Sequence, residues 1–289
     1  MSRILLLTLT NLLVVVIFGF LLKLLGLKDN VNQISLFIMI IFGFAGSIIS
    51  ILLSKLIILN SINGKIIIKP INKNEIWIMK TILNISKKKK IKMPEVIIYK
   101  SNDINAFATG PCSNNSLIGL SSNLIKYMKK NEIEAVIAHE ISHISNGDMV
   151  TMGLLQGIMN TFILFLSQII TSLICNQEKK NNQKFNFLQN IKTTIFTSLE
   201  IILGSLSNII IMGFSRYREF RADADAAKLV GKNNMILALN RLKISYKTIN
   251  NSNMITFYIN GGKLNVLNNI FNSHPSLDDR IKALINFKN

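Results

Sequence analysis

Four long apolar stretches alternate with polar sections along the chain. They cover residues 4–25, 34–59, 149–174 and 193–214. The first two exceed the roughly 20 apolar residues that are needed to cross a hydrocarbon core, so both are predicted to span a membrane. A cleaved signal peptide would not explain residues 4–25, because the apolar run is too long and no small-residue cleavage site follows it. The pattern predicts a multi-pass helical membrane protein.

The third and fourth stretches carry polar side chains within their apolar runs. Gln156, Asn160 and Gln168 lie in the third stretch, and Glu200 lies in the fourth. Because hydrocarbon solvates such groups poorly, these side chains should face protein or a water-filled cavity. Glu200 is either a functional group or a residue that packs against neighbouring helices or lies near the membrane interface. We favour the second interpretation.

The polar section between the second and third stretches has the pattern of a small β-sheet. Alternating and β-branched residues predict strands at 94–99, 106–109 and 116–120. Turn residues separate these strands, at Asn102-Asp103, Gly110-Pro111 and Asn114-Asn115. After the fourth stretch, helical spacing of apolar residues predicts helices at 234–249 and 278–287.

The predicted elements place the chain in the α+β class, mainly α. We expect four sections along the sequence. These are two N-terminal transmembrane helices (1–60), an α/β part (61–148), a transmembrane or partly embedded helical hairpin (149–214) and a helical part (215–289).

A histidine pair lies just before the third apolar stretch. His139, Glu140 and His143 form the pattern HExxH. On a helix, positions i and i+4 share one face, so both imidazoles can bind one cation. Glu140 can then serve as general base toward a water molecule. The pattern favours a catalytic metal site.

Local signals independently predict a helix around this pair. Asn131 and Glu134 resemble a capping box, apolar residues keep helical spacing, and Asn146-Gly147 supplies a stop. The alternative is that His139 and His143 are ordinary helix residues. With only 3 His in the chain, chance formation of the motif is improbable, so we favour the metal site.

A third metal ligand is needed, because catalytic zinc usually has three protein ligands and an open position. Glu219 is the best candidate, in a charged run that we expect to open a helix at residues 215–223. Asp223 lies four residues later and can accept the ring N–H of a ligating histidine. Without HExxH, this run would be interpreted as a solvated helix face.

The metal site constrains the membrane topology. His139, His143 and Glu219 must lie on one side of the membrane, so the third and fourth stretches form a hairpin. Lysines in 65–100 and the arginines of the 216–221 run then share the cytoplasmic side by the positive-inside rule. The loop 175–192 would then lie outside the membrane although it carries several lysines, which conflicts with the positive-inside rule. We give the shared metal site more weight than the charge of this short loop.

The net charge of +18 does not indicate nucleic-acid binding. The lysines are dispersed, and no nucleic-acid-binding signature is present, so we expect no nucleic-acid partner. The cluster at residues 87–92 more naturally meets lipid head groups or water. Cys112 and Cys175 are expected on or toward opposite sides of the membrane, so no structural disulfide is predicted.

Four motifs in sequence order resemble the HtpX family of bacterial membrane-bound zinc metalloproteases, which is related to the CAAX prenyl proteases. The resemblance covers essentially the whole chain. The motifs are residues 105–110 (NAFATG), 139–143 (HEISH) with 146–148 (NGD), 218–223 (REFRAD) and 274–280 (HPSLDDR).

The resemblance implies a zincin-like catalytic domain with one Zn²⁺ per chain. Asn105, Ala106 and Phe107 would belong to a strand that pairs with extended substrate, and His274 would stabilise the transition state. The implied activity is endoproteolysis of misfolded or damaged membrane proteins during stress. The implied location is the inner membrane of a bacterial cell, with the active site facing the cytoplasm.

Two other functions are weighed against this one. A specific processing protease of the CAAX type is less favoured, because relatives of that kind carry more transmembrane helices than four. A non-catalytic membrane scaffold or pore would use Glu200 and the polar helix faces, but it leaves HExxH and Glu219 unexplained.

Overall fold

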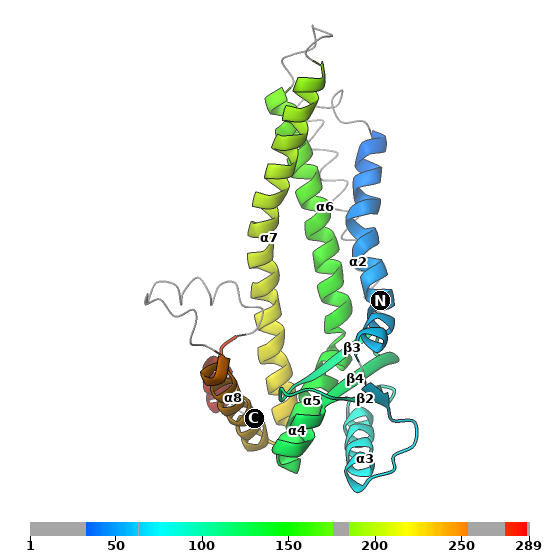
Figure 1. Cartoon of the computed structure of the whole chain (residues 1–289), viewed down its shortest axis with the longest axis vertical. Coiled ribbons are helices and arrows are strands. Elements are labelled where there is room, and N and C mark those ends of the chain that lie inside the picture. Colours follow the sequence, from blue (N-terminus) through cyan, green and yellow to red (C-terminus); the bar gives the residue numbers. More distant parts are fainter. Residues whose placement is uncertain (1–32, 63, 176–184, 254–274, 288–289) are drawn as a thin grey trace. The chain divides into compact units, whose positions relative to one another are not determined.

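The computed structural model describes residues 33–62, 64–175, 185–253 and 275–287 (Figure 1). The predicted span at 4–25, residues 176–184 of the loop 175–192 and His274 lie outside the described residues. The chain divides into two compact units, one formed by Met1–Ser50 and Gly153–Ile211 and the other by Ile51–Met152 and Met212–Asn289.

The first unit contains most of three helices, α2 (Gln33–Ser61), α6 (Asp148–Cys175) and α7 (Phe185–Val230). Within the described residues, Asp148–Ile174 and Asn190–Val230 are long and apolar enough to cross a membrane, and Ala45–Ser61 is a shorter apolar stretch. The predicted helices at 149–174 and 193–214 are therefore confirmed as long apolar helices.

Helix α7 exposes large apolar side chains along its membrane-length part. Ile201 is 71% exposed, and Ile202, Leu206 and Ile210 are each more than half exposed. A contiguous surface of this kind is unfavourable in water and favours an apolar environment.

Helix α7 also corrects one prediction. Residues 215–223 do not open a helix, because α7 runs unbroken for 46 residues from the apolar stretch into the charged run. The change from apolar to charged residues was interpreted as a boundary. The sequence there contains no Pro, and single glycines are tolerated inside a helix, so nothing ends it.

The second unit contains a mixed four-stranded sheet, in the order β1-β2-β4-β3. Strands β2 and β4 are parallel, and β3 pairs with β4 antiparallel, which places β3 at one end of the sheet. The three predicted strands are confirmed, whereas β1 was not predicted. The strands are β1 (Gly64–Ile66), β2 (Glu95–Tyr99), β3 (Ala106–Cys112) and β4 (Asn115–Ser121).

The predicted turn at Gly110-Pro111 is wrong, because both residues continue β3. The pairing of β3 with β4 shifts register between Thr109 and Cys112, and Gly110 has φ 141°. A Cβ at Gly110 would lie 2.3 Å from the carbonyl oxygen of Asn115. Glycine is therefore required here for a β-bulge and for the close approach of β4, and not for a chain reversal.

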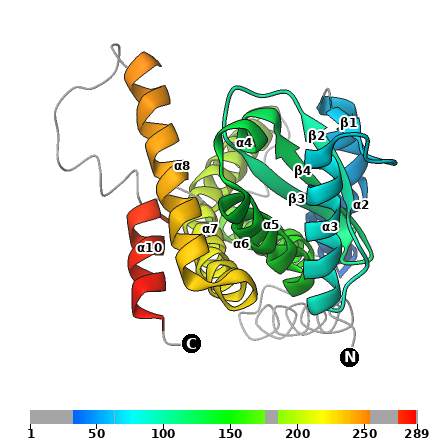
Figure 2. The same ribbon diagram turned by 90° about the horizontal axis from the view of Figure 1, so that it is seen from below.

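Helices pack around this sheet and enclose one apolar core (Figure 2). Helix α5 contacts β3, α3 and α8, and α10 contacts α8. The core includes Ile78 and Ile82 of α3, Leu120 of β4 and Ile137 of α5, all fully buried. The helices are α3 (Lys73–Lys88), α4 (Ser122–Tyr127), α5 (Lys130–Asn146), α8 (Lys232–Asn253) and α10 (Leu277–Asn286).

Helix α5 begins earlier than predicted and ends where predicted. Its first turn is capped by Glu132, whose Oε2 accepts from the main-chain N–H of Lys129 at 2.8 Å. The predicted capping box at Asn131 and Glu134 is therefore wrong, and the Asn131 amide instead donates to Asn234 at 3.2 Å. The helix ends at Gly147, whose φ of 64° gives the left-handed conformation that glycine accommodates.

Candidate metal centre

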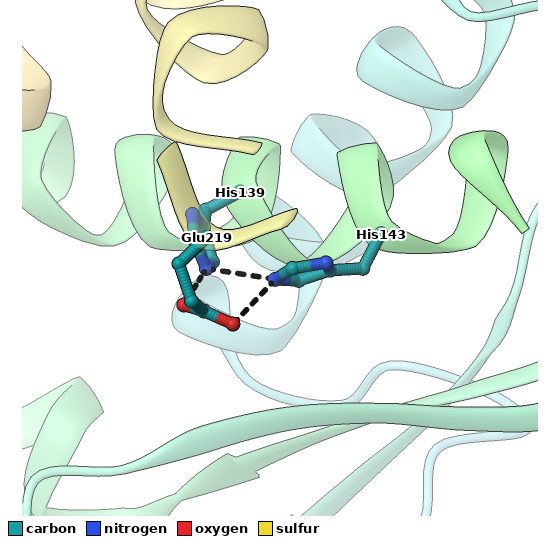
Figure 3. A group of neighbouring side chains, drawn as sticks. All are labelled: His139, His143 and Glu219. Carbon is teal, nitrogen blue, oxygen red and sulfur yellow. Dashed lines mark hydrogen bonds and ion pairs between the residues drawn. The ribbon is translucent and has the colours of Figure 1, made fainter. Parts of the chain in front are cut away.

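His139 and His143 lie one turn apart on α5, and their rings converge (Figure 3). Their Nε2 atoms are 3.1 Å apart, and the ring planes are nearly perpendicular at 89°. Both residues are buried, with 7% and 9% of their surfaces exposed. Because they share one face of a helix, helix geometry alone brings the two nitrogens together.

Glu219 completes the group from α7. Its Oε2 lies 3.5 Å from His139 Nε2, and its Oε1 lies 3.4 Å from His143 Nε2. Two imidazoles and a carboxylate are ligands that zinc accepts, and ligands bound tetrahedrally at their usual distances are about 3.3 Å apart. The spacing of these buried donor atoms therefore fits one zinc ion.

Asp223 lies behind the first imidazole. Its Oδ1 is 2.9 Å from His139 Nδ1, on the side of the ring opposite Glu219. Arg280 of α10 donates to both carboxylate oxygens of Asp223, from Nε at 2.7 Å and from Nη2 at 2.6 Å. Burial raises the pKa of Asp223, but the hydrogen bonds from Arg280 and His139 outweigh burial and lower it. Asp223 is therefore an anionic partner for His139.

Asp148 lies behind the second imidazole. Its Oδ2 is 2.6 Å from His143 Nδ1, and its Oδ1 accepts from Arg221 at 2.7 Å. Sequence reasoning missed both Asp148 and the role of Arg280. An aspartate directly after the glycine that ends the HExxH helix was the available signal for Asp148. No local signal connects Arg280 to a site 57 residues earlier in the chain.

These carboxylates change the acidity of the two imidazoles. Burial lowers the pKa of His139, but hydrogen bonds to Asp223 and Glu219 reverse the effect, and the net shift is upward. Burial also lowers the pKa of His143, but hydrogen bonds to Asp148 and Glu219 raise it to about 9. Because zinc binds the neutral imidazole, protons and a metal ion compete for this centre.

The other predicted site residues have different positions. Glu140 follows His139 on α5 and is partly exposed. Asn105 is exposed and directly precedes β3, which contacts α5, and its main-chain N–H donates to Ser121 Oγ at 3.0 Å. Ala106 and Phe107 begin β3 at the end of the sheet. His274 lies outside the described residues.

Comparison with known proteins places these observations in a family. Residues 72–288 match Peptidase family M48. The chain is 50% identical over 291 residues to Protease HtpX of Buchnera aphidicola subsp. Baizongia pistaciae, covering 99% of each sequence. It is 49% identical to Protease HtpX of Wigglesworthia glossinidia brevipalpis and 48% identical to that of Cronobacter sakazakii, over at least 98% of each sequence.

A solved structure has a similar fold. The crystal structure of S. mikatae Ste24p matches with a TM-score of 0.64 at 22% identity. The match covers 96% of this chain and 64% of the Ste24p chain, so this chain is similar to part of a longer protein.

Proposed function

The chain belongs to peptidase family M48, and from this membership and the geometry of its metal centre we propose that it is a zinc endopeptidase that removes misfolded or damaged membrane proteins. The observation that carries the proposal is the convergence of His139 Nε2, His143 Nε2 and the Glu219 carboxylate at zinc-ligand spacing. The chain is a metalloprotease by family, and its apolar helices support attachment to a membrane.

Each residue of the centre has a distinct role in the proposed reaction. His139, His143 and Glu219 would hold one zinc ion, which when bound would act as a Lewis acid on a peptide carbonyl and on water. Glu140 accepts a proton from the attacking water and transfers it to the leaving amine. Asp223 lies 2.9 Å from His139 Nδ1, where its carboxylate would hold the ring proton on Nδ1 and leave Nε2 free for the ion.

Strand β3 is the proposed binding element for the substrate backbone. It lies at an end of the sheet and contacts the helix that carries HExxH. An extended substrate beside Asn105, Ala106 and Phe107 would form main-chain hydrogen bonds, which do not depend on side-chain identity. Such binding supports broad specificity, as quality control requires. We assign His274 to stabilisation of the transition state in the same reaction.

The proposed site faces the cytoplasm of a bacterial cell, at its inner membrane. All three metal ligands must reach one ion, so the chain has to return to the same side between His143 and Glu219. The lysines and arginines around the site favour the cytoplasmic side. A membrane scaffold or pore would not require a buried group of two imidazoles and a carboxylate.

The decisive experiment compares the full-length wild-type chain with Glu140→Gln in detergent, using casein as substrate and measuring zinc content in parallel. We expect zinc-dependent cleavage by the wild type. The variant should bind zinc equally well but lose cleavage, because an amide keeps the shape of the side chain and cannot accept the proton. An inert wild-type protein with zinc bound, or a fully active variant, would refute the proposed function.

A further inference from the structure

The carboxylate of Asp148 holds the second imidazole as Asp223 holds the first. Asp148 is 1% exposed, and its Oδ2 lies 2.6 Å from His143 Nδ1. An ionised carboxylate can only accept a hydrogen bond, so in the neutral ring the proton lies on Nδ1. The lone pair of His143 is then on Nε2, the atom that faces Glu219 at 3.4 Å.

Two arginines of α7 hold Asp148 in this place. Arg221 donates from Nη2 to Asp148 Oδ1 at 2.7 Å, and Arg218 donates from Nη1 to the main-chain oxygen of Asp148 at 3.3 Å. Glu219 lies between these arginines in the sequence. One turn of α7 therefore supplies Glu219, the third metal ligand. The same turn also binds Asp148, whose carboxylate contacts His143, the second ligand.

The local chain path makes this contact possible. Gly147 ends α5 in a left-handed conformation, and its N–H donates to the carbonyls of His143 and Ile144. The chain turns there, and Asp148 becomes the first residue of α6. An acidic residue in the first turn of a helix also stabilises that helix through the helix dipole. This purely structural role is the alternative that an experiment has to separate.

We propose that Asp148 is a positioning residue for His143, and that Arg221 holds Asp148 in the geometry which directs His143 Nε2 to the metal. The inference rests on the proposed zinc site. It means that the metal centre has a His–Asp–Arg chain behind each imidazole, from His139 through Asp223 to Arg280 and from His143 through Asp148 to Arg221.

The test measures zinc affinity and the state of the imidazole. Zinc affinity is determined in detergent by competition with a chelator for Asp148→Asn, Asp148→Ala, Arg221→Ala and Arg221→Lys. The Nδ1–H signal of His143 is followed by NMR of ¹⁵N-histidine in the zinc-loaded protein. The chain has only 3 His, so a His274→Gln background leaves two signals to assign.

Two control variants remove paired charges that lie outside the metal centre. Asp225→Asn removes a partly buried carboxylate on α7 that pairs with Lys89 and Asn146 and touches neither imidazole. Arg241→Ala removes an arginine whose side chain is 36% exposed and pairs with the buried Glu132, compared with 43% for Arg221.

We expect the Asp148 variants to bind zinc 10- to 100-fold more weakly, with Asp148→Ala the more affected and its His143 Nδ1–H signal lost. Arg221→Ala should weaken zinc binding several-fold, with partial recovery in Arg221→Lys, and both controls should retain wild-type affinity. If either Asp148 variant folds and keeps wild-type zinc affinity and the same signal, Asp148 only stabilises α6. If neither folds, unchanged affinity in Arg221→Ala overturns the proposal.

The outcome is independent of proteolysis. A protein that binds zinc through an intact His143 and Asp148 but cleaves nothing would refute the proposed function and leave this inference standing. Normal cleavage, together with a zinc affinity that does not change when Asp148 is replaced, would refute this inference and leave the proposed function standing.

Discussion

Arg280 binds both carboxylate oxygens of Asp223, although the two residues are 57 positions apart in the chain. Arg280 also lies 3.4 Å from Glu219. A residue of the last described helix therefore contacts both a proposed metal ligand, Glu219, and Asp223, the partner of the ligand His139. Helix α10 is therefore part of the metal centre and does more than cover the core.

Replacing Arg280 with alanine should destabilise the protein and weaken zinc binding. The substitution leaves the buried Asp223 carboxylate without its cation, which costs about 3 kcal/mol for pairs of this kind. Thermal unfolding and zinc competition measure the two effects. Lys282→Ala, an exposed change on the same helix, is the control and should have neither effect. Wild-type stability and affinity in Arg280→Ala would show that α10 is dispensable for the centre.

Replacing Glu219 should affect metal retention first. Glu219→Ala deletes a charged ligand, and Glu219→Gln keeps its shape with a weaker donor, so zinc affinity should fall in both and further in the alanine variant. Metal content after dialysis against a chelator measures this loss. Glu134→Gln, a partly exposed change on α5, serves as the control. Undiminished zinc content in Glu219→Ala would mean that another residue is the third ligand.

Zinc binding should release protons and become tighter as pH rises. The metal-free protein holds His143 with a pKa of about 9, above its ordinary value of 6.5, so the imidazole is protonated at neutral pH. Zinc needs the neutral ring, and its apparent affinity should increase up to about pH 9. Calorimetry in buffers of different ionisation enthalpy counts the protons. An affinity that is constant between pH 6.5 and 9 would contradict this expectation.

The metal-free protein should show the opposite trend in stability. A pKa that is raised on folding contributes stability that is complete below the unfolded value and is lost as pH rises through the folded value. The contribution of His143 should therefore decline between pH 6.5 and about 9. Thermal unfolding of chelator-treated protein measures the decline, which should be smaller in His143→Gln, where only the raised pKa of His139 still contributes.

The membrane topology can be tested by labelling. In a chain without Cys112 and Cys175, a cysteine at Glu178 should react with a membrane-impermeant thiol reagent added from outside, whereas one at Asn240 of α8 should not. Zinc ligation requires His143 and Glu219 on one side, whereas lysines in a short outer loop cost only some insertion free energy. Protection of the position 178 cysteine would mean that α6 and α7 do not both cross the membrane.

Local periodicity was sufficient to predict much of the fold. The spacing of His139 and His143 predicted that both side chains share one face of α5, and Gly147 predicted where the helix ends. Both predictions depend only on residues within a few positions of one another. The same reasoning singled out Glu219 and Asp223 as a pair on one helix face. The structure places both beside the histidines.

Contacts between distant segments could not be predicted in this way. Arg280 reaches Asp223 through the packing of α10 on α8, and Arg221 reaches Asp148 from another helix. The start of α5 was also missed, because Glu134 was predicted to be the capping residue, whereas Glu132 caps the helix. Arg241 pairs with that residue from α8.

The carboxylates and arginines around the imidazoles also determine the charge balance of this buried centre. Four carboxylates and three arginines leave a formal excess of one negative charge when both imidazoles are neutral. One divalent cation adds the same charge to this group as two protons on the imidazoles do. Protons and the metal are therefore alternative counter-charges for one preformed group of ligands. The seven side chains are Glu140, Asp148, Glu219, Asp223, Arg218, Arg221 and Arg280.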